Sequence, residues 1–259
     1  MNMYDNPATV AHSFDENYLS PYLIQAQWAE CIALKAVIYE LANRLQRPIS
    51  ILDIGVGSGR VIQNLHDIPE IWQHVAHYTG TDNAVLCLDL ASKMVNTLGI
   101  TDKVTLIQMD AVHLQELTAT FDLVICTWFT PGNFYPDDFD FENYPKSFQK
   151  LDLSKNPKFT AIFSQAYSLL VPQGEIVLGA CYKDNEATRF KQEFSYKKMG
   201  MTVITAPRDS FTATLERFWS QRFTKEKLIS YLSFVPVDCI SFHDLDTYEY
   251  AFQVRVKKQ

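Results

Sequence analysis

Hydrophobic residues recur every three or four positions over a long stretch near the start of the chain, which predicts an amphipathic helix. These positions are Leu23, Ile24, Trp28, Cys31, Leu34, Ile38, Leu41 and Leu45. Ser20 followed by Pro21 is a typical start signal, with serine as the cap and proline at the first helical position. An aliphatic run at 51–54 then predicts a buried strand, and Val61, Ile62 and Leu65 at helical spacing predict a helix after a tight turn.

The same alternation of strand and helix continues along the chain. Strands are expected at 77–82, 104–110, 121–126 and 176–178, and a helix carries Val85, Leu86, Leu90, Met94 and Leu98. The segment 67–72 has a proline and charges, which favour a loop insertion. Beyond residue 183 we expect helices at 184–198 and 224–232, a hairpin pairing 201–205 with 212–218, and two final strands at 237–242 and 248–256.

Three alternate glycines, Gly55, Gly57 and Gly59, form the turn after the first strand. Glycine allows close approach of a ligand to the backbone and dihedral angles that a Cβ forbids, while free N–H groups at the helix start face the ligand. A dinucleotide site has GxGxxG spacing, but Arg60 stands at the sixth position here. This spacing disfavours a pyrophosphate ligand.

The segment DxGxGxG from Asp53 to Gly59 resembles motif I of the class I S-adenosylmethionine (SAM) dependent methyltransferases. Asp82 ends the second strand where that family has the acid that holds the ribose hydroxyls, and Asp110 with Ala111 matches its adenine site. Residues 121–126 and 169–175 resemble motifs IV and V. The resemblance is close over about 48–182. From the residues alone, a glycine turn of another α/β protein, a solvated Asp82 and a helix-capping Asp110 stay open as alternatives.

This resemblance implies an α/β fold with a seven-stranded, mostly parallel sheet, helices on both faces and an antiparallel last strand. It implies SAM as cofactor and S-adenosylhomocysteine (SAH) as product. The implied cofactor-binding residues are Asp53, Gly55, Val56, Gly57, Gly59, Asp82, Asn83, Asp110, Ala111 and Cys126.

Composition narrows the range of partners. The chain has 259 residues with 47% hydrophobic content, enough for one domain with a sizeable core. A net charge of −7 disfavours a nucleic-acid partner, which needs a basic surface, and no NPPY-type motif follows the fourth strand. Five cysteines without CxxC spacing indicate neither a zinc site nor a disulfide framework. We expect a cytoplasmic monomer or homodimer without a membrane segment or signal peptide.

We interpret the chain as a single domain, 1–259. Residues 1–46 form an N-terminal lid and helix, 47–182 the cofactor-binding core, 127–155 a substrate-loop insertion, and 183–259 a cap hairpin with the closing strands. The aromatic and acidic segment 4–18 is expected to fold over the cofactor, and a loosely docked tail is the alternative.

The insertion is rich in aromatic and acidic residues from 127 to 144 and leaves the end of a central strand, where open α/β sheets bind ligands. Aromatic faces together with carboxylates favour a cationic acceptor, whereas a small satellite core is the structural alternative. Residues 131–134 are also similar to the IGNF loop of histidine methyltransferases, whose asparagine touches substrate. The expected substrate-binding residues are Tyr18, Thr127, Trp128, Asn133, Phe134 and Tyr135.

The chemistry expected of such a site is simple, because the cofactor carries an activated methyl group and the protein mainly places a nucleophile in line with it. No Ser-His-Asp order, GxSxG or HExxH motif is visible, and no acid cluster follows the fourth strand, so we expect no metal. His243 is the first candidate for a general base and His12 the second, with a surface histidine as the alternative.

We therefore predict a SAM-dependent methyltransferase that acts on a small molecule, on nitrogen of an amine or amino acid. Oxygen or carboxylate methylation is the alternative acceptor chemistry. A catalytically silent SAM-binding protein is the alternative from another class.

Overall fold

The computed structural model describes residues 4, 6–15, 17–144, 151–245 and 250–259. Its centre is a seven-stranded sheet in the order β3-β2-β1-β4-β5-β9-β8. Neighbouring strands from β3 to β5 are parallel, and β9 lies antiparallel between β5 and β8. This arrangement confirms the predicted fold class and the antiparallel last strand. The strands are β1 (Ile49–Ile54), β2 (Val75–Asp82), β3 (Val104–Gln108), β4 (Phe121–Cys126), β5 (Leu170–Tyr182), β8 (Ile240–Asp244) and β9 (Ala251–Lys257).

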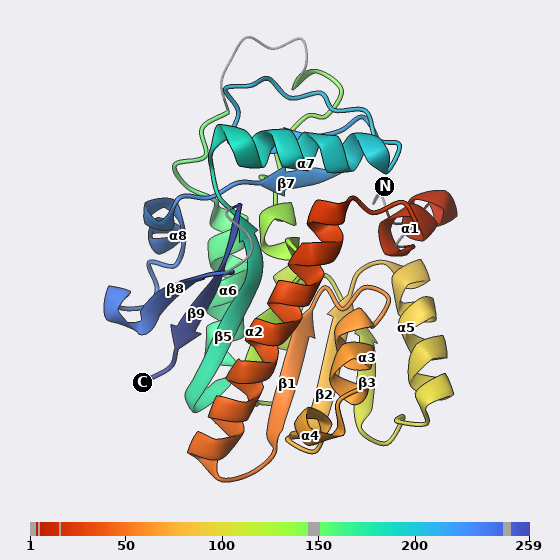
Figure 1. Cartoon of the computed structure of the whole chain (residues 1–259). Coiled ribbons are helices and arrows are strands. Elements are labelled where there is room, and N and C mark those ends of the chain that lie inside the picture. The colour runs from red at the N-terminus through yellow and green to blue at the C-terminus, as the bar shows by residue number, and fades with distance from the viewer. Residues whose placement is uncertain (1–3, 5, 16, 145–150, 246–249) are drawn as a thin grey trace.

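Helices cover both faces of the sheet, and alternate residues of the central strands face opposite cores. Ile49 and Ile51 pack with α2 (Pro21–Leu45), α3 (Arg60–His66) and α5 (Val85–Leu98), whereas Leu52 and Ile54 pack with α6 (Pro157–Ser168) and α8 (Lys225–Tyr231). Figure 1 shows the first group in front of the sheet. Burial on both faces explains why the strands read as nearly continuous apolar runs.

Helix α2 begins as its sequence predicts, since the Ser20 side chain accepts a hydrogen bond from the backbone N–H of Leu23 and Pro21 stands at the first turn. Its apolar stripe differs from the predicted one. Trp28 is 68% exposed, whereas Glu30 is only 2% exposed and lies on the buried stripe between Ala26 and Leu34.

Three local predictions are corrected. Residues 67–72 contain the short helix α4 (Pro69–Trp72) rather than only a loop, because Pro69 supplies a helix start. Residues 237–239 form the 3-10 turn η5 (Val237–Cys239), so β8 starts later than expected. The hairpin pairs β6 (Phe211–Ala213) with β7 (Trp219–Gln221), and Val203 forms only an isolated bridge to Thr214.

The physical reason for the different hairpin register is its turn. Arg217 adopts φ 66° in a tight turn closed by the Thr214 and Phe218 backbones, and Phe211 stacks on Trp219 at 3.8 Å between ring centroids. The remaining elements are α1 (Pro7–Phe14), η2 (Ala111–Glu116), η3 (Thr130–Asn133) and α7 (Glu186–Lys198). Helices α1 and α7 and strand β7 lie at the same end of the molecule in Figure 1. None of the helices in the described ranges is long and apolar enough to cross a membrane.

Candidate active site

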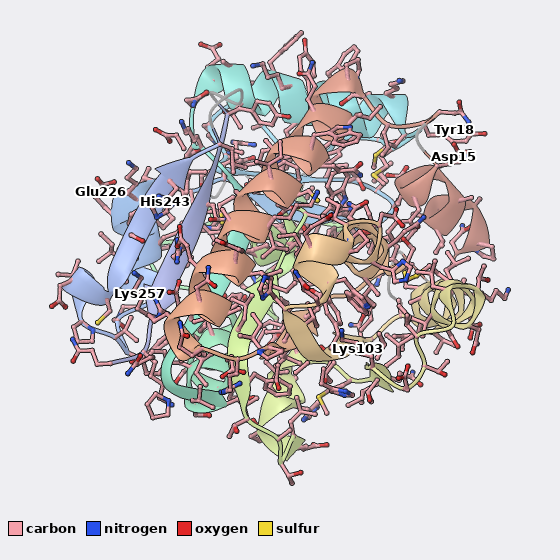
Figure 2. All side chains as sticks on the ribbon, turned by 60° about the horizontal axis from the view of Figure 1, so that its bottom comes forward. Asp15, Tyr18, Lys103, Glu226, His243 and Lys257 are labelled. Carbon is pink, nitrogen blue, oxygen red and sulfur yellow. The ribbon has the colours of Figure 1, made fainter. Side chains whose placement is uncertain are left out.

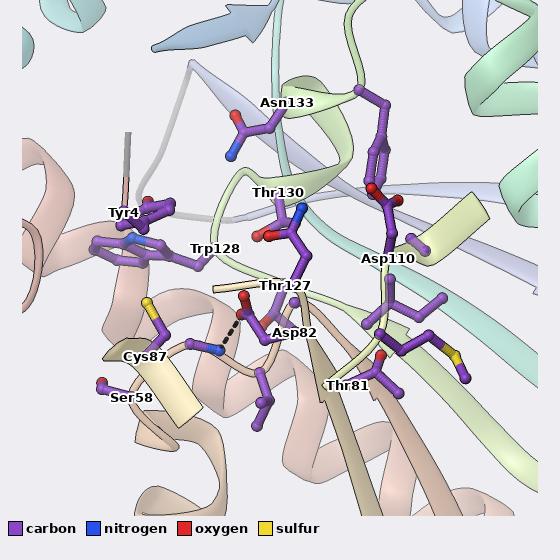
Figure 3. Close-up of a pocket in the computed structure, with 18 of the residues that line it drawn as sticks. Tyr4, Ser58, Thr81, Asp82, Cys87, Asp110, Thr127, Trp128, Thr130 and Asn133 are labelled. Carbon is purple, nitrogen blue, oxygen red and sulfur yellow. Dashed lines mark hydrogen bonds between the residues drawn. The ribbon is translucent and has the colours of Figure 1, made fainter. Parts of the chain in front are cut away.

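A cavity of about 350 Å³ lies at the carboxyl ends of β1, β2 and β4. Its walls come from the strand ends, the glycine turn, the N-terminal segment, the loop after β4, the first turns of α5 and α6, and the β6–β7 hairpin. Figure 3 shows Asp82 and Asp110 with Trp128 and Asn133 of the loop around this cavity. It is lined by Tyr4, Phe14, Ile54, Gly55, Val56, Gly57, Ser58, Arg60, Val61, Thr81, Asp82, Asn83, Cys87, Met109, Asp110, Ala111, Thr127, Trp128, Thr130, Asn133, Phe134, Tyr135, Lys158, Arg217, Phe218 and Trp219.

The glycine turn forms the floor of this cavity. Gly55 and Gly57 have φ values of 79° and 56°, which L side chains rarely adopt. A Cβ on Gly55 would lie 2.8 Å from the Thr130 side chain, and a Cβ on Gly57 would lie 3.3 Å from the Phe14 ring. Gly59 also has positive φ, but it faces α5 and not the cavity.

Asp82 is held at the end of β2 by backbone donors. Its Oδ2 accepts a hydrogen bond from Gly57 N at 2.9 Å, drawn in Figure 3, and its Oδ1 accepts one from Ala84 N at 2.9 Å. Burial raises the pKa of this carboxyl, and the backbone donors oppose that rise. A carboxylate has about four acceptor sites, and the backbone donors Gly57, Ala84 and Asn83 take three of them, so at least one is left for a ligand. A fully solvated Asp82 is excluded by this setting.

Asp110 and Ala111 line the cavity at the end of β3. The Asp110 Oδ1 also accepts a hydrogen bond from Val112 N at 3.1 Å and caps η2. Asp110 is therefore a helix cap, as the alternative interpretation expected. Only Oδ1 takes part in this cap, and Oδ2 does not.

Asp53, Gly59 and Cys126 lie outside the cavity lining, unlike the other expected cofactor residues. Tyr78 donates a hydrogen bond to Asp53 Oδ2 at 2.6 Å, and Asp53 Oδ1 has no hydrogen-bond partner among the described residues. Burial raises the pKa of Asp53 to about 7 and raises the pKa of the Cys126 thiol. The side chains of Asp53 and Cys126 are buried next to the strand ends and do not reach the cavity.

The backbone after β4 has unusual dihedral angles and is held by Glu30, which belongs to no sequence motif. Trp128 and Phe129 both have positive φ, at 55° and 61°. Glu30 Oε1 accepts a hydrogen bond from Trp128 N at 2.7 Å, and Glu30 Oε2 lies 3.6 Å from Arg60 Nη2. The Arg60 guanidinium also lies 4.5 Å from the centroid of the Trp128 ring. The sequence signal for Glu30 was a lone acid at helical spacing from Ala26 and Leu34.

The loop after β4 serves two purposes. Thr127, Trp128, Asn133, Phe134 and Tyr135 line the cavity as expected. Further along, Phe139 and Phe141 pack with Phe211 and Trp219 in a separate small core, which was the structural alternative.

None of the loop carboxylates Asp137, Asp138, Asp140 and Glu142 lines the cavity, so the expected acidic lining is wrong. Asp137 and Glu142 instead pair with the cavity residues Lys158 and Arg217. These two cations are further lining residues that sequence reasoning missed.

The N-terminal segment covers one side of the cavity through Tyr4 and Phe14, and α1 packs on α5 through Val10, Ala84 and Cys87. Tyr18 does not line the cavity. It is 40% exposed and stacks on His12 at 4.0 Å between ring centroids.

His243 also lies outside, on the edge strand β8, where its Nε2 is 3.1 Å from Ser241 Oγ. Figure 2 shows Tyr18 and His243 at opposite sides of the molecule. No histidine lines the cavity within the described part of the chain, so the interpretation of His243 or His12 as a base has no geometric support. Among the same residues, no three His, Cys, Asp or Glu side chains are grouped for a metal ion.

The strand order, the glycine turn and the acids at the ends of β2 and β3 together define a class I SAM-dependent methyltransferase. A family model described as a methyltransferase domain matches residues 45–232, and the chain belongs to this family. No curated protein matches the chain.

Solved structures share the fold at low identity. A SAM-dependent methyltransferase from Clostridium acetobutylicum ATCC 824 has a TM-score of 0.54 at 13% identity, covering 86% of this chain and 90% of that one. The CcbJ methyltransferase from Streptomyces caelestis has a TM-score of 0.55 at 14% identity, with 89% and 90% covered. Magnesium protoporphyrin IX methyltransferase from Synechocystis PCC 6803 has a TM-score of 0.52 at 12% identity, with 100% and 98% covered.

Proposed function

We propose that this methyltransferase transfers the methyl group of SAM to a small-molecule acceptor, on nitrogen of an amine or amino-acid-like compound. The observation that carries the proposal is the cavity itself. Its volume lies in the range of small-molecule sites, and segments far apart in the sequence enclose it. A net charge of −7 also opposes a nucleic-acid acceptor.

The core residues fit the cofactor. Gly55 and Gly57 give the turn the positive φ angles that bring its backbone to the cavity, and the acceptor site of Asp82 that the backbone donors leave unused suits a ribose hydroxyl. Asp110, Ala111, Asn83 and Val56 all line the cavity, and we assign Asp110 and Ala111 to the adenine. Bound SAM supplies a methyl group activated by its sulfonium.

The acceptor occupies the remaining wall, formed by Trp128, Asn133, Tyr135 and Trp219. The rings give an apolar surface with little conformational freedom, which holds a small acceptor in line with the methyl group. Asn133 Oδ1 is buried without a hydrogen-bond partner in the described ranges, so it is available to orient a polar group of the acceptor.

The proton chemistry follows from which groups line the cavity. An ammonium has no lone pair, so the amine must react in its neutral form. Burial raises the pKa of the Cys87 thiol to about 12 and raises the pKa of Tyr4, so neither side chain is a base at neutral pH. Asp82 and Asp110 also line the cavity, but we assign both to the cofactor. The acceptor therefore loses its proton to solvent before transfer.

The test uses SAM labelled in its methyl group and a metabolite extract that has passed an ultrafiltration membrane. We expect label in an acceptor that survives nuclease treatment and mild alkali, and a rate that rises with pH toward the pKa of the amine. An ester releases its methyl as volatile methanol in mild alkali, so alkali-labile label would establish the carboxylate alternative. SAH binding without any transfer would establish a silent cofactor-binding protein.

His243→Ala is a suitable control variant. Its side chain lies outside the cavity lining on β8, so its rate should equal that of the wild type across the whole pH range. A loss of the alkaline limb in this variant would restore the histidine as a base and refute the proposed route of the proton.

A further inference from the structure

The acceptor side of the cavity carries positive charge. The lining acids Asp82 and Asp110 both stand at strand ends of the cofactor core. Two lining cations come from elements other than the strand ends, Lys158 in the first turn of α6 and Arg217 in the turn between β6 and β7. No carboxylate from the described parts of the loop or cap lines this side.

Each of these cations is already paired with a loop carboxylate that faces solvent. Lys158 Nζ lies 2.9 Å from Asp137 Oδ1, and Arg217 Nη2 lies 3.1 Å from Glu142 Oε1. The carboxylate side chains are 83% and 78% exposed, whereas the Lys158 side chain is 22% exposed. Ion pairs with such solvated partners contribute little stability, so an entering anion can replace the carboxylates.

Both cations line the cavity, and an aromatic contact places Lys158 beside Tyr135. Lys158 Nζ lies 5.2 Å from the centroid of the Tyr135 ring, and Tyr135 lies 6.1 Å from Trp219 between ring centroids. Trp219 follows Arg217 by two residues. The two cations therefore flank the surface on which the acceptor packs.

We propose that Lys158 and Arg217 bind an anionic group of the acceptor, a carboxylate or a phosphate, in exchange for Asp137 and Glu142. This inference rests on the proposed function, because it concerns the same small-molecule acceptor. Arginine presents a planar fork that matches either anion, and lysine adds a point charge. The acceptor is then an amine that also carries an acidic group.

Kinetics of variants test the exchange. We expect Lys158→Met and Arg217→Gln each to raise the KM for the acceptor on the order of tenfold, with the KM for SAM unchanged. Asp137→Asn and Glu142→Gln should lower the KM for the acceptor, because they remove the competing carboxylates. If these pairs only hold the loop, all four variants should raise it, and that outcome would refute the proposal.

Lys183→Met is the matched control. Its Nζ lies 2.9 Å from Asp244 Oδ1, and its side chain is 26% exposed, close to the values for Lys158. Lys183 is outside the cavity lining, so the Lys183→Met variant should have the same KM for the acceptor as the wild type.

Fractionation of the extract tests the chemical class. At a pH above the pKa of the amine, where the amine is neutral, the acceptor should be retained by an anion-exchange resin, and phosphatase treatment then separates a phosphate from a carboxylate. An acceptor that passes through the resin at this pH would refute the anionic group while leaving methyl transfer to a small molecule intact. Absence of transfer in every fraction would instead refute the proposed function.

Discussion

Gly179 in β5 is predicted to exclude any side chain because Glu30 fills the space beside it. A Cβ built on Gly179 would lie 3.0 Å from Glu30 Cδ and 3.3 Å from Glu30 Cγ. Glu30 cannot move aside freely, because it is 2% exposed and accepts the hydrogen bond from Trp128 N. Gly179→Ala should therefore displace the carboxylate and leave Trp128 N without its acceptor.

The cost follows from these contacts. Losing a buried hydrogen bond to a charged acceptor costs about 1.5 to 3 kcal/mol, and crowding a packed site adds about 1 kcal/mol or more. We expect Gly179→Ala to lower the free energy of unfolding by about 2 to 4 kcal/mol and Glu30→Ala by a similar amount. Glu30→Gln should cost less, because its amide oxygen still accepts from Trp128 and burial already raises the pKa of the Glu30 carboxyl.

Urea unfolding of the two single variants and the double variant measures the coupling. In the double variant, the methyl group of the new alanine at position 179 meets no carboxylate, because Glu30 is also alanine. The double variant should therefore be about as stable as Glu30→Ala alone. The interaction free energy then equals in magnitude the whole cost of Gly179→Ala, about 2 to 4 kcal/mol. Additive costs would show that Gly179 is needed for another reason and would refute this account of the Glu30 contact.

Three further predictions concern the cofactor core. Asp82→Ala should weaken SAH binding by about 1.5 to 3 kcal/mol in calorimetric titration, because it removes the charged acceptor for a ribose hydroxyl, and unchanged affinity would refute the assignment. Methyl transfer should survive EDTA, and a loss restored by magnesium would contradict metal independence. Asp53 has a folded pKa of about 7 against an ordinary value of 3.8, so wild-type stability falls as pH rises between these values. Asp53→Asn should gain roughly 2 to 4 kcal/mol relative to wild type over that range in pH-dependent urea unfolding, and a constant difference would refute the burial effect.

The succession of strands and helices and the cofactor end of the cavity could be predicted because their determinants are local in sequence. Each strand is a short apolar run, Gly55 and Gly57 come shortly after β1, and Asp82 ends β2. A turn with positive φ favours glycine, and this preference is visible without the fold.

The acceptor side could not be predicted in the same way, because its contacts join distant segments. Glu30 meets Trp128 across 98 positions, and Glu142 meets Arg217 across 75. The acids of the loop were visible in the sequence, but their direction depends on Phe139 and its neighbours, whose packing turns the carboxylates toward solvent. The expectation of an acidic wall that binds a cation failed because of that packing, which leaves Lys158 and Arg217 rather than the loop carboxylates in the cavity lining.

Glu30 connects the two ends of the cavity. It holds the backbone of Trp128 on the acceptor wall and pairs with Arg60, which begins α3 directly after the glycine turn. A change at Glu30 therefore reaches both the cofactor turn and the acceptor loop, and it should alter the KM values for SAM and acceptor together. Lys158 and Arg217 form their ion pairs with the loop carboxylates Asp137 and Glu142, so their effects should be confined to the acceptor. This difference separates residues that shape the whole cavity from residues that select what enters it.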